Sequence, residues 1–159
     1  MVKFVLDADA SIKLAKGGVL EPLIRSAKCF ITKQVYEEIL KGKDKMYEDA
    51  FCTERLVREG KLSLSNITAE GIEGLGEGEC SALALFRKLM ADSIISDDRR
   101  FLSILEARRI PFIISTDVIA MLCIKRQISK IEAMAALEKI RRLVREENYN
   151  SAKRTIGGK

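Results

Sequence analysis

The chain has 159 residues, with 28 Lys and Arg against 23 Asp and Glu, four cysteines and no histidine. This length suits one domain with a substantial core, and 47% apolar and 32% charged residues are ordinary for a globular protein. The missing histidine excludes Ser-His-Asp and Cys-His hydrolases and histidine-ligated zinc. Any chemistry must therefore use carboxylates, lysine, hydroxyls, thiols, backbone dipoles or a metal held by oxygen.

The net charge of +5 is concentrated near the C-terminus. Residues 138–159 hold seven Lys and Arg against three Glu, a net charge of +4, which leaves +1 for residues 1–137. A basic end on a near-neutral body can attract polyanions, or it can be a solvated helix face followed by a frayed tail. Charge by itself favours the second interpretation.

The four cysteines are irregularly spaced, without a C-x-x-C pair, which argues against zinc ribbons and redox pairs. No window approaches the roughly 18 apolar residues that a membrane span needs. The N-terminal apolar stretch is too short for a signal peptide. The sequence therefore predicts a cytoplasmic protein with reduced thiols and no membrane segment.

Apolar runs of strand type alternate with helical periods along the chain. The predicted strands are 2–6, 28–32, an edge strand at 61–67, 93–96 and 111–115. The predicted helices are 8–15, 19–27, 34–41, 44–59, 78–91, 99–109, 116–125 and 129–145. Phe51 and Ile131 are expected on the inner faces of their helices.

Short strands separated by helices are typical of a parallel sheet with helices on both faces. The pattern predicts one three-layer α/β/α domain over residues 1–147, with a central parallel sheet of four or five strands. Residues 148–159 are expected to form a basic, disordered tail.

Acidic residues follow two of the predicted core strands directly. Asp7 and Asp9 follow strand 2–6, and the pair Asp97-Asp98 follows strand 93–96. Ligands of open α/β sheets gather at the carboxyl ends of the strands, and these acids lie at that edge. A carboxylate beside a buried strand is costly unless something compensates it.

Two further acidic pairs can reach the same edge from helices. Glu37 and Glu38 lie one turn into the helix after the second strand, and Glu77 and Glu79 lie in a glycine-flanked helix start. Each could also be an ordinary surface acid. Together the acids would repel one another in a cleft, and Mg²⁺ or Mn²⁺ would relieve that repulsion without any histidine. Such a site favours hydrolysis at phosphorus.

Four segments in order, FVLDADAS, ITKQVYEEILKG, LGEGECSALAL and IISDDRRFL, resemble the PIN-domain nucleases over residues 2–125. The resemblance implies the family's parallel sheet between helices. It places the first family Asp at Asp7, the helix Glu at Glu38 (with Glu37 as an alternative) and the Gly-Glu-x-x-Ala acid at Glu79. The last family acid falls on Asp97 or Asp98; the Ser-x-Asp spacing favours Asp98.

The same resemblance implies a metal-dependent endoribonuclease that uses Mg²⁺ or Mn²⁺ and takes RNA as substrate. It also implies a homodimer and, where the chain is the toxin of a toxin–antitoxin pair, a small antitoxin partner. The residues expected to support the metal ligands or to contact substrate are Asp9, Ser11, Ser96, Arg99 and Arg100. Asp9 departs from the family, in which Thr, Ser or Asn is common near this position.

Two alternatives stay open at this point. LDADAS and IISDD also fit haloacid-dehalogenase-type phosphatases, with Asp7 as the nucleophile and Asp9 as the general acid and base. That family leaves Glu38 and Glu79 without a role. The domain could also be a catalytically inert PIN-like module for RNA binding or assembly, because a fold does not fix a function.

Overall fold

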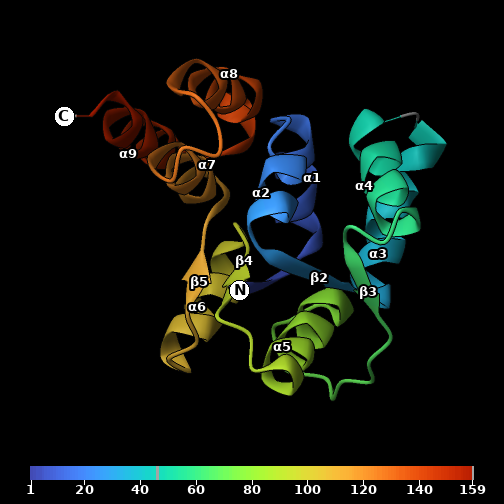
Figure 1. Cartoon of the computed structure of the whole chain (residues 1–159). Coiled ribbons are helices and arrows are strands. Elements are labelled where there is room, and N and C mark those ends of the chain that lie inside the picture. The colour runs from blue at the N-terminus through green and yellow to red at the C-terminus, as the bar shows by residue number, and fades with distance from the viewer. Residues whose placement is uncertain (46, 159) are drawn as a thin grey trace.

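The computed structural model describes residues 1–45 and 47–158, and it contains a five-stranded sheet (Figure 1). The strands are β1 (Lys3–Leu6), β2 (Lys28–Thr32), β3 (Ser63–Ser65), β4 (Ser93–Ile95) and β5 (Phe112–Ile113). Their order is β3-β2-β1-β4-β5, and every neighbouring pair is parallel. The predicted parallel sheet and the edge position of β3 are confirmed.

The helices alternate with the strands as the sequence predicted. They are α1 (Ala8–Lys16), α2 (Leu20–Ser26), α3 (Lys33–Leu40), α4 (Glu48–Arg58), α5 (Glu77–Leu89), α6 (Arg99–Ala107), α7 (Ser115–Ile124), α8 (Lys130–Ile140) and α9 (Glu146–Gly157). Two short 3₁₀ segments, η1 (Lys41–Lys45) and η2 (Arg141–Leu143), follow α3 and α8. None of the described helices combines the length and apolar character needed to cross a bilayer.

Alternate strand residues enter two separate cores, which makes the fold three-layered. Leu6 of β1 packs in the core that includes α1, α2 and α7, whereas Val5 packs in the core under α5 and α6. On β4, Ile95 and Ile94 divide between the two cores in the same way. Successive side chains of a strand point to opposite faces, so short apolar runs such as KFVL suit a sheet covered on both sides.

The chain order of the strands creates a switch point in the middle of the sheet. From β1 the chain builds outward to β2 and β3, then returns to place β4 on the other side of β1. Connections leave the sheet in opposite directions at this point, and the carboxyl ends of β1 and β4 border a crevice. Asp7 immediately follows the end of β1, and the pair Asp97-Asp98 follows the end of β4 after Ser96.

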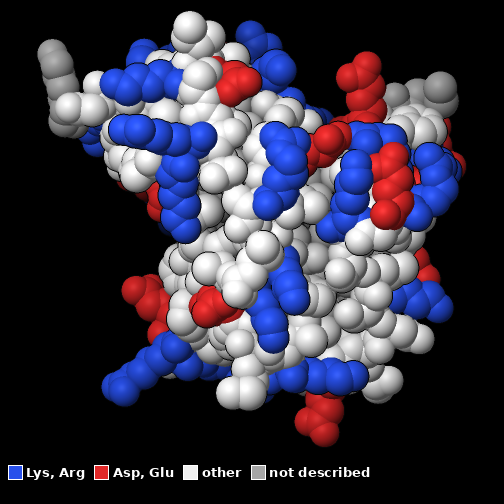
Figure 2. All heavy atoms as spheres, in the orientation of Figure 1, with Lys and Arg blue, Asp and Glu red and all other residues white. Residues whose placement is uncertain are grey.

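The prediction of a disordered tail is wrong, because residues 146–157 form α9. Tyr149, Ala152 and Ile156 are each at most 2% exposed and belong to the larger core. Their spacing places them on one helix face against α7 and α8. Around this buried stripe the helix is polar, and Figure 2 shows Lys and Arg side chains gathered over the part of the surface formed by α8 and α9.

Two apolar side chains expected in the core are exposed instead. Phe51 is 40% exposed and lies under the ammonium group of Lys43, while its neighbour Ala50 fills the inner position of α4. Ile131 is 83% exposed, because the buried face of α8 runs through Ala133, Ala136, Leu137 and Ile140. Ile131 precedes Ala133 by two residues, which turns it about 200° away from that face.

Candidate active site

Seven acidic side chains line one cleft at the carboxyl edge of the sheet. The cleft has a volume of about 430 Å³. Its acidic residues are Asp7, Asp9, Glu37, Glu38, Glu77, Glu79 and Asp98. The expected sites from β1, α3, α5 and the end of β4 are therefore brought together, and Asp97 is the expected acid that does not line the cleft.

Asp7 is the most deeply buried of these acids, with 4% of its surface exposed. It is the N-cap of α1: its Oδ1 accepts a hydrogen bond from the Ala10 N–H at 2.8 Å, which satisfies a free donor of the first helical turn. The pKa of Asp7 is raised from 3.8 to about 7: burial is the main cause and the charges of Asp9 and Asp97 add to it, whereas the hydrogen bonds from Ser96 and Ala10 act to lower it.

Two serines fix the position of Asp7. The Ser96 hydroxyl donates to Asp7 Oδ2, and its oxygen accepts from the Asp98 N–H at 3.2 Å, so it joins the ends of β1 and β4. The Ser11 hydroxyl donates to the backbone carbonyl of Asp7 at 2.7 Å and does not contact the carboxylate. Both serines are fully buried, which suits groups that hold a geometry.

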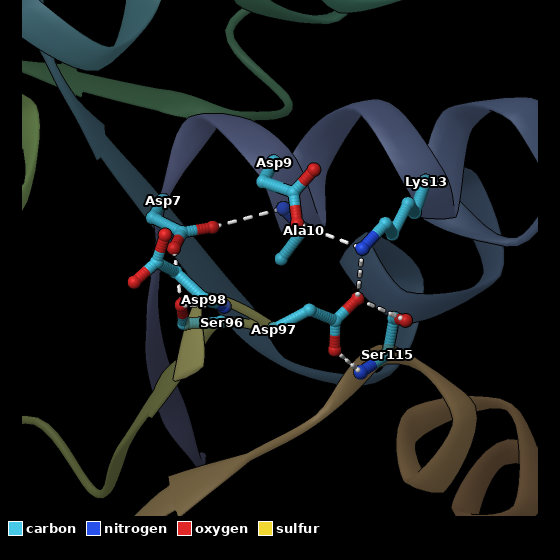
Figure 3. Close-up of polar contacts among 8 residues, drawn as sticks. All are labelled: Asp7, Asp9, Ala10, Lys13, Ser96, Asp97, Asp98 and Ser115. Atoms are coloured by element: carbon cyan, nitrogen blue, oxygen red, sulfur yellow. Dashed lines mark hydrogen bonds and ion pairs between the residues drawn. The ribbon is translucent and has the colours of Figure 1, made fainter. Parts of the chain in front are cut away.

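The two adjacent acids Asp97 and Asp98 point in opposite directions (Figure 3). Asp98 caps α6 through its Oδ1, which accepts from the Phe101 N–H at 2.9 Å, and it faces the cleft beside Asp7. Asp97 turns toward α7, where its Oδ1 accepts from the Ser115 N–H at 2.8 Å and its Oδ2 accepts from the Ser115 hydroxyl at 2.5 Å. The structure thus separates a cleft acid, Asp98, from an acid that ties β4 to α7.

Lys13 is a site residue that the sequence reasoning missed. Its ammonium group lies 2.8 Å from Asp9 Oδ2 and 3.2 Å from Asp97 Oδ2, with 11% of the side chain exposed (Figure 3). Burial works to lower the pKa of Lys13, but the hydrogen bond to Asp9 and the charge of Asp97 raise it above its ordinary value. The signal in the sequence is the i,i+4 spacing of Asp9 and Lys13 on one helix.

Glu38 and Glu79 approach each other across the cleft. Glu79 Oε1 accepts from the Gly76 N–H at 3.0 Å, and burial together with the charges of Asp98 and Glu38 raises the pKa of Glu79 despite this bond. A side chain at Gly78 would place its Cβ 3.1 Å from Glu38 Oε2, so glycine leaves the room that Glu38 occupies. Glu37, in contrast, is 62% exposed beside Lys33.

A family model described as a PIN domain matches residues 3–157. The chain belongs to the PIN-domain family. The match includes both the acidic cleft and α9, so the C-terminal helix is part of the family's domain. A search of curated proteins finds no match to the chain.

Arginines border the acidic cleft of this PIN domain on one side. A neighbouring hollow of about 520 Å³ is lined by Gly74, Leu75, Gly76, Glu79, Asp98, Arg99 and Arg100. Glu79 and Asp98 line both spaces, so the hollow lined by Arg99 and Arg100 adjoins the acidic cleft. Lys41 lines the cleft itself. A phosphate chain crossing the acids would meet these cations.

The donor atoms of the cleft suit a hard divalent cation in a partly hydrated form. Within the described chain, no three Asp, Glu or Cys side chains lie close enough together to ligate one ion directly. Mg²⁺ commonly keeps several waters and binds through one or two carboxylates, so a cleft lined by separate carboxylates fits such an ion. PIN domains are generally nucleases that use divalent metals, in agreement with this chemistry.

The PIN assignment weakens the phosphatase alternative. In that reading Asp9 would serve as the acid and base, but here Asp9 is paired with Lys13. α1 begins at Ala8, directly after Asp7, without an intervening flap. Family membership and local structure therefore both favour a nuclease-like site over a haloacid-dehalogenase-type one.

Proposed function

We propose that this PIN domain is a metal-dependent endoribonuclease that hydrolyses RNA phosphodiester bonds with Mg²⁺ or Mn²⁺. The observation that carries the proposal is the convergence of Asp7, Glu38, Glu79 and Asp98 on one cleft, although they come from four separate parts of the chain. Burial and the charges of neighbouring carboxylates raise the pKa of Asp7 and that of Glu79, which destabilises the fold, and a bound cation would relieve this effect.

Each group of residues has its own part in this proposal. Asp7, Glu38, Glu79 and Asp98 would hold the cation, directly or through water, and the bound ion supplies an activated water and neutralises charge on phosphate. Ser96 and Ser11 hold Asp7 in place. Arg99 and Arg100 would bind phosphates beside the reacting one, because guanidinium groups suit phosphate oxygens.

Substitution of Asp7 by Asn tests the proposal directly. Asn keeps an oxygen for the cap of α1 but loses the charge, so we expect cleavage of a fluorescent single-stranded RNA with Mg²⁺ or Mn²⁺ to fall by about a thousandfold or more. The matched controls are Glu37→Gln and Glu77→Gln, which remove cleft charges outside the four proposed ligands and should change the rate by only a few-fold. Cleavage that survives Asp7→Asn would refute the assignment.

The same experiment separates the alternatives. A phosphatase of the haloacid-dehalogenase type would hydrolyse phosphomonoesters and would be trapped at Asp7 by beryllofluoride. An inert module would bind RNA without cleaving it under any divalent ion. Either result would replace the nuclease as the function of this site.

The proposal also includes partners and a location. We propose a toxin of a toxin–antitoxin pair whose small antitoxin occupies the acidic cleft, and a homodimer as the assembly. A basic side chain of an antitoxin would suit the seven carboxylates of the cleft. Light scattering of the purified chain tests the dimer, and inhibition of cleavage by the product of an adjacent reading frame tests the antitoxin. The cysteine spacing, without a disulfide framework, supports the cytoplasm as the location.

A further inference from the structure

The charge of the chain is divided between two parts of the fold. Residues 1–124, which contain the sheet and the acidic cleft, hold 18 Lys and Arg against 19 Asp and Glu. Residues 125–159 hold ten against four. The positive charge of the protein therefore belongs to the segment that contains α8, η2 and α9, where Figure 2 shows many basic side chains together. A concentration of this kind attracts polyanions.

A hollow in this segment is lined by three of these cations. It has a volume of about 660 Å³, and Lys139, Arg141 and Arg142 line it; we call these three residues the basic patch. Glu138 and Glu146 also line the hollow. The Glu138 carboxylate accepts a hydrogen bond from the Tyr149 hydroxyl and lies 3.8 Å from the Arg141 guanidinium. These internal contacts offset part of its negative charge. Lys139 and Arg142 form no ion pair with any described residue.

The Arg141 guanidinium is held in place before any ligand arrives. Its centre lies 4.5 Å from the centroid of the Tyr149 ring, and that ring is itself 1% exposed. The Glu138 carboxylate accepts a hydrogen bond from the Tyr149 hydroxyl and forms a longer ion pair with the guanidinium, so the three side chains orient one another. The Arg141 side chain remains 55% exposed. A fixed, exposed guanidinium can bind phosphate in a bidentate manner or stack on a base with little loss of entropy.

Helix α1 relates the basic patch to the acidic cleft. Asp7 caps the N-terminal end of α1 in the cleft. Gly18 follows the C-terminal end of α1 and lies beside Lys139: a Cβ added at Gly18 would be 3.8 Å from Lys139 Nζ. Nine helical residues span about 14 Å. A single RNA strand of modest length could therefore contact both places.

We propose that the basic patch is a second binding site for the RNA backbone, which anchors the substrate outside the acidic cleft. The inference rests on the proposed function, because it takes RNA as the ligand of the same protein. RNA is favoured over an acidic protein segment because a planar guanidinium beside two unpaired cations suits regularly spaced phosphates and bases. The patch would supply affinity for long substrates and take no part in bond cleavage.

The test measures RNA binding in the absence of cleavage. In an Asp7→Asn background with EDTA, the combined change Lys139→Gln, Arg141→Gln and Arg142→Gln is compared with Lys28→Gln, Arg58→Gln and Lys88→Gln. The control removes three exposed cations outside the patch and the cleft. Fluorescence anisotropy with a 20-nucleotide single strand gives Kd between 50 and 300 mM KCl. A variant with only Lys139→Gln and Arg142→Gln keeps the Arg141–Tyr149 contact, in case the triple change unfolds α9.

We expect the patch variant to raise Kd at least about tenfold and to lower the slope of log Kd against log salt by about 2, since each lost phosphate contact on a single strand removes about 0.7. In the double variant the slope should fall by about two-thirds as much as in the triple variant, and in the control it should change little. Equal losses in patch and control variants would overturn the anchor. So would a patch variant that keeps its affinity for RNA but no longer binds polyglutamate.

The outcome stays separable from that of the nuclease proposal. A chain that binds RNA through the patch but cleaves no RNA refutes the nuclease and leaves the anchor standing. Cleavage that is unchanged for both a tetranucleotide and the 20-nucleotide strand in the patch variant overturns the anchor and leaves the nuclease. The anchor predicts normal cleavage of the short strand and a KM raised at least about tenfold for the long one.

Discussion

The acidic cleft and the basic patch use charge in opposite ways. In the cleft, Asp7 is buried with other carboxylates around it, and its pKa is raised to about 7. In the patch, Lys139, Arg141 and Arg142 are exposed to water, and solvent screens their repulsion. The cleft therefore destabilises the protein without a ligand, whereas the patch leaves stability almost unchanged. This contrast suggests a site for chemistry in the first case and a site for attachment in the second.

The sharpest comparison within the cleft itself is between Asp98 and Asp97. Asp98→Asn should keep the cap of α6 and lower RNA cleavage by about a thousandfold, because it removes a proposed ligand. Asp97→Asn should lower cleavage far less and instead reduce the free energy of unfolding by about 1–3 kcal/mol, since it weakens the contacts to Lys13 and Ser115. Cleavage rates and urea unfolding of both variants measure this. The reverse result, with the larger loss of cleavage in Asp97→Asn, would show that Asp97 and not Asp98 is the ligand of the cation.

The buried charge of Asp7 predicts how stability depends on pH. The pKa of Asp7 in the fold, about 7, lies above its ordinary value of 3.8, so folding favours the protonated form. In EDTA the contribution of Asp7 to the free energy of unfolding is complete below about pH 4. It is lost as the pH rises through 7, and the loss is roughly 4 kcal/mol at most.

Thermal unfolding from pH 4 to 8 checks this pH dependence. As the pH rises, the unfolding midpoint of the native chain should fall relative to that of Asp7→Asn. Mg²⁺ or Mn²⁺ should raise the midpoint of the native chain. A difference that does not change with pH would mean that Asp7 is not destabilised by burial.

The basic patch depends on a folded α9, which can be tested through one buried residue. Ile156 is 2% exposed, so Ile156→Ala should lower the free energy of unfolding by about 2–3 kcal/mol. Ile131 is 83% exposed, and Ile131→Ala should change it by less than about 0.5 kcal/mol. Urea midpoints of the two variants check the difference. Equal small effects would mean that the C-terminal segment does not pack on α7 and α8.

Much of the fold could be predicted from the sequence because the strands are short apolar runs bounded by clear helix signals. KCFIT and SIIS fall within one residue of β2 and β4. The acids after β1 and β4, together with the glycines before Glu79, predicted a site at the carboxyl edge of the sheet. The errors came where burial depends on a partner far along the chain: Tyr149, Ala152 and Ile156 form an apolar stripe only when α7 and α8 are in place.

The sequence by itself determined the type of sheet and the approximate place of the acidic site, since both follow from local periodicity and from which residues end each strand. Only the tertiary structure decided that Asp98 faces the cleft while Asp97 turns to Ser115, and that Lys13 joins Asp9 to Asp97. The reason is physical. The direction of a side chain after a strand depends on which distant donors reach it, and Ser115 lies 18 residues away along the chain from Asp97.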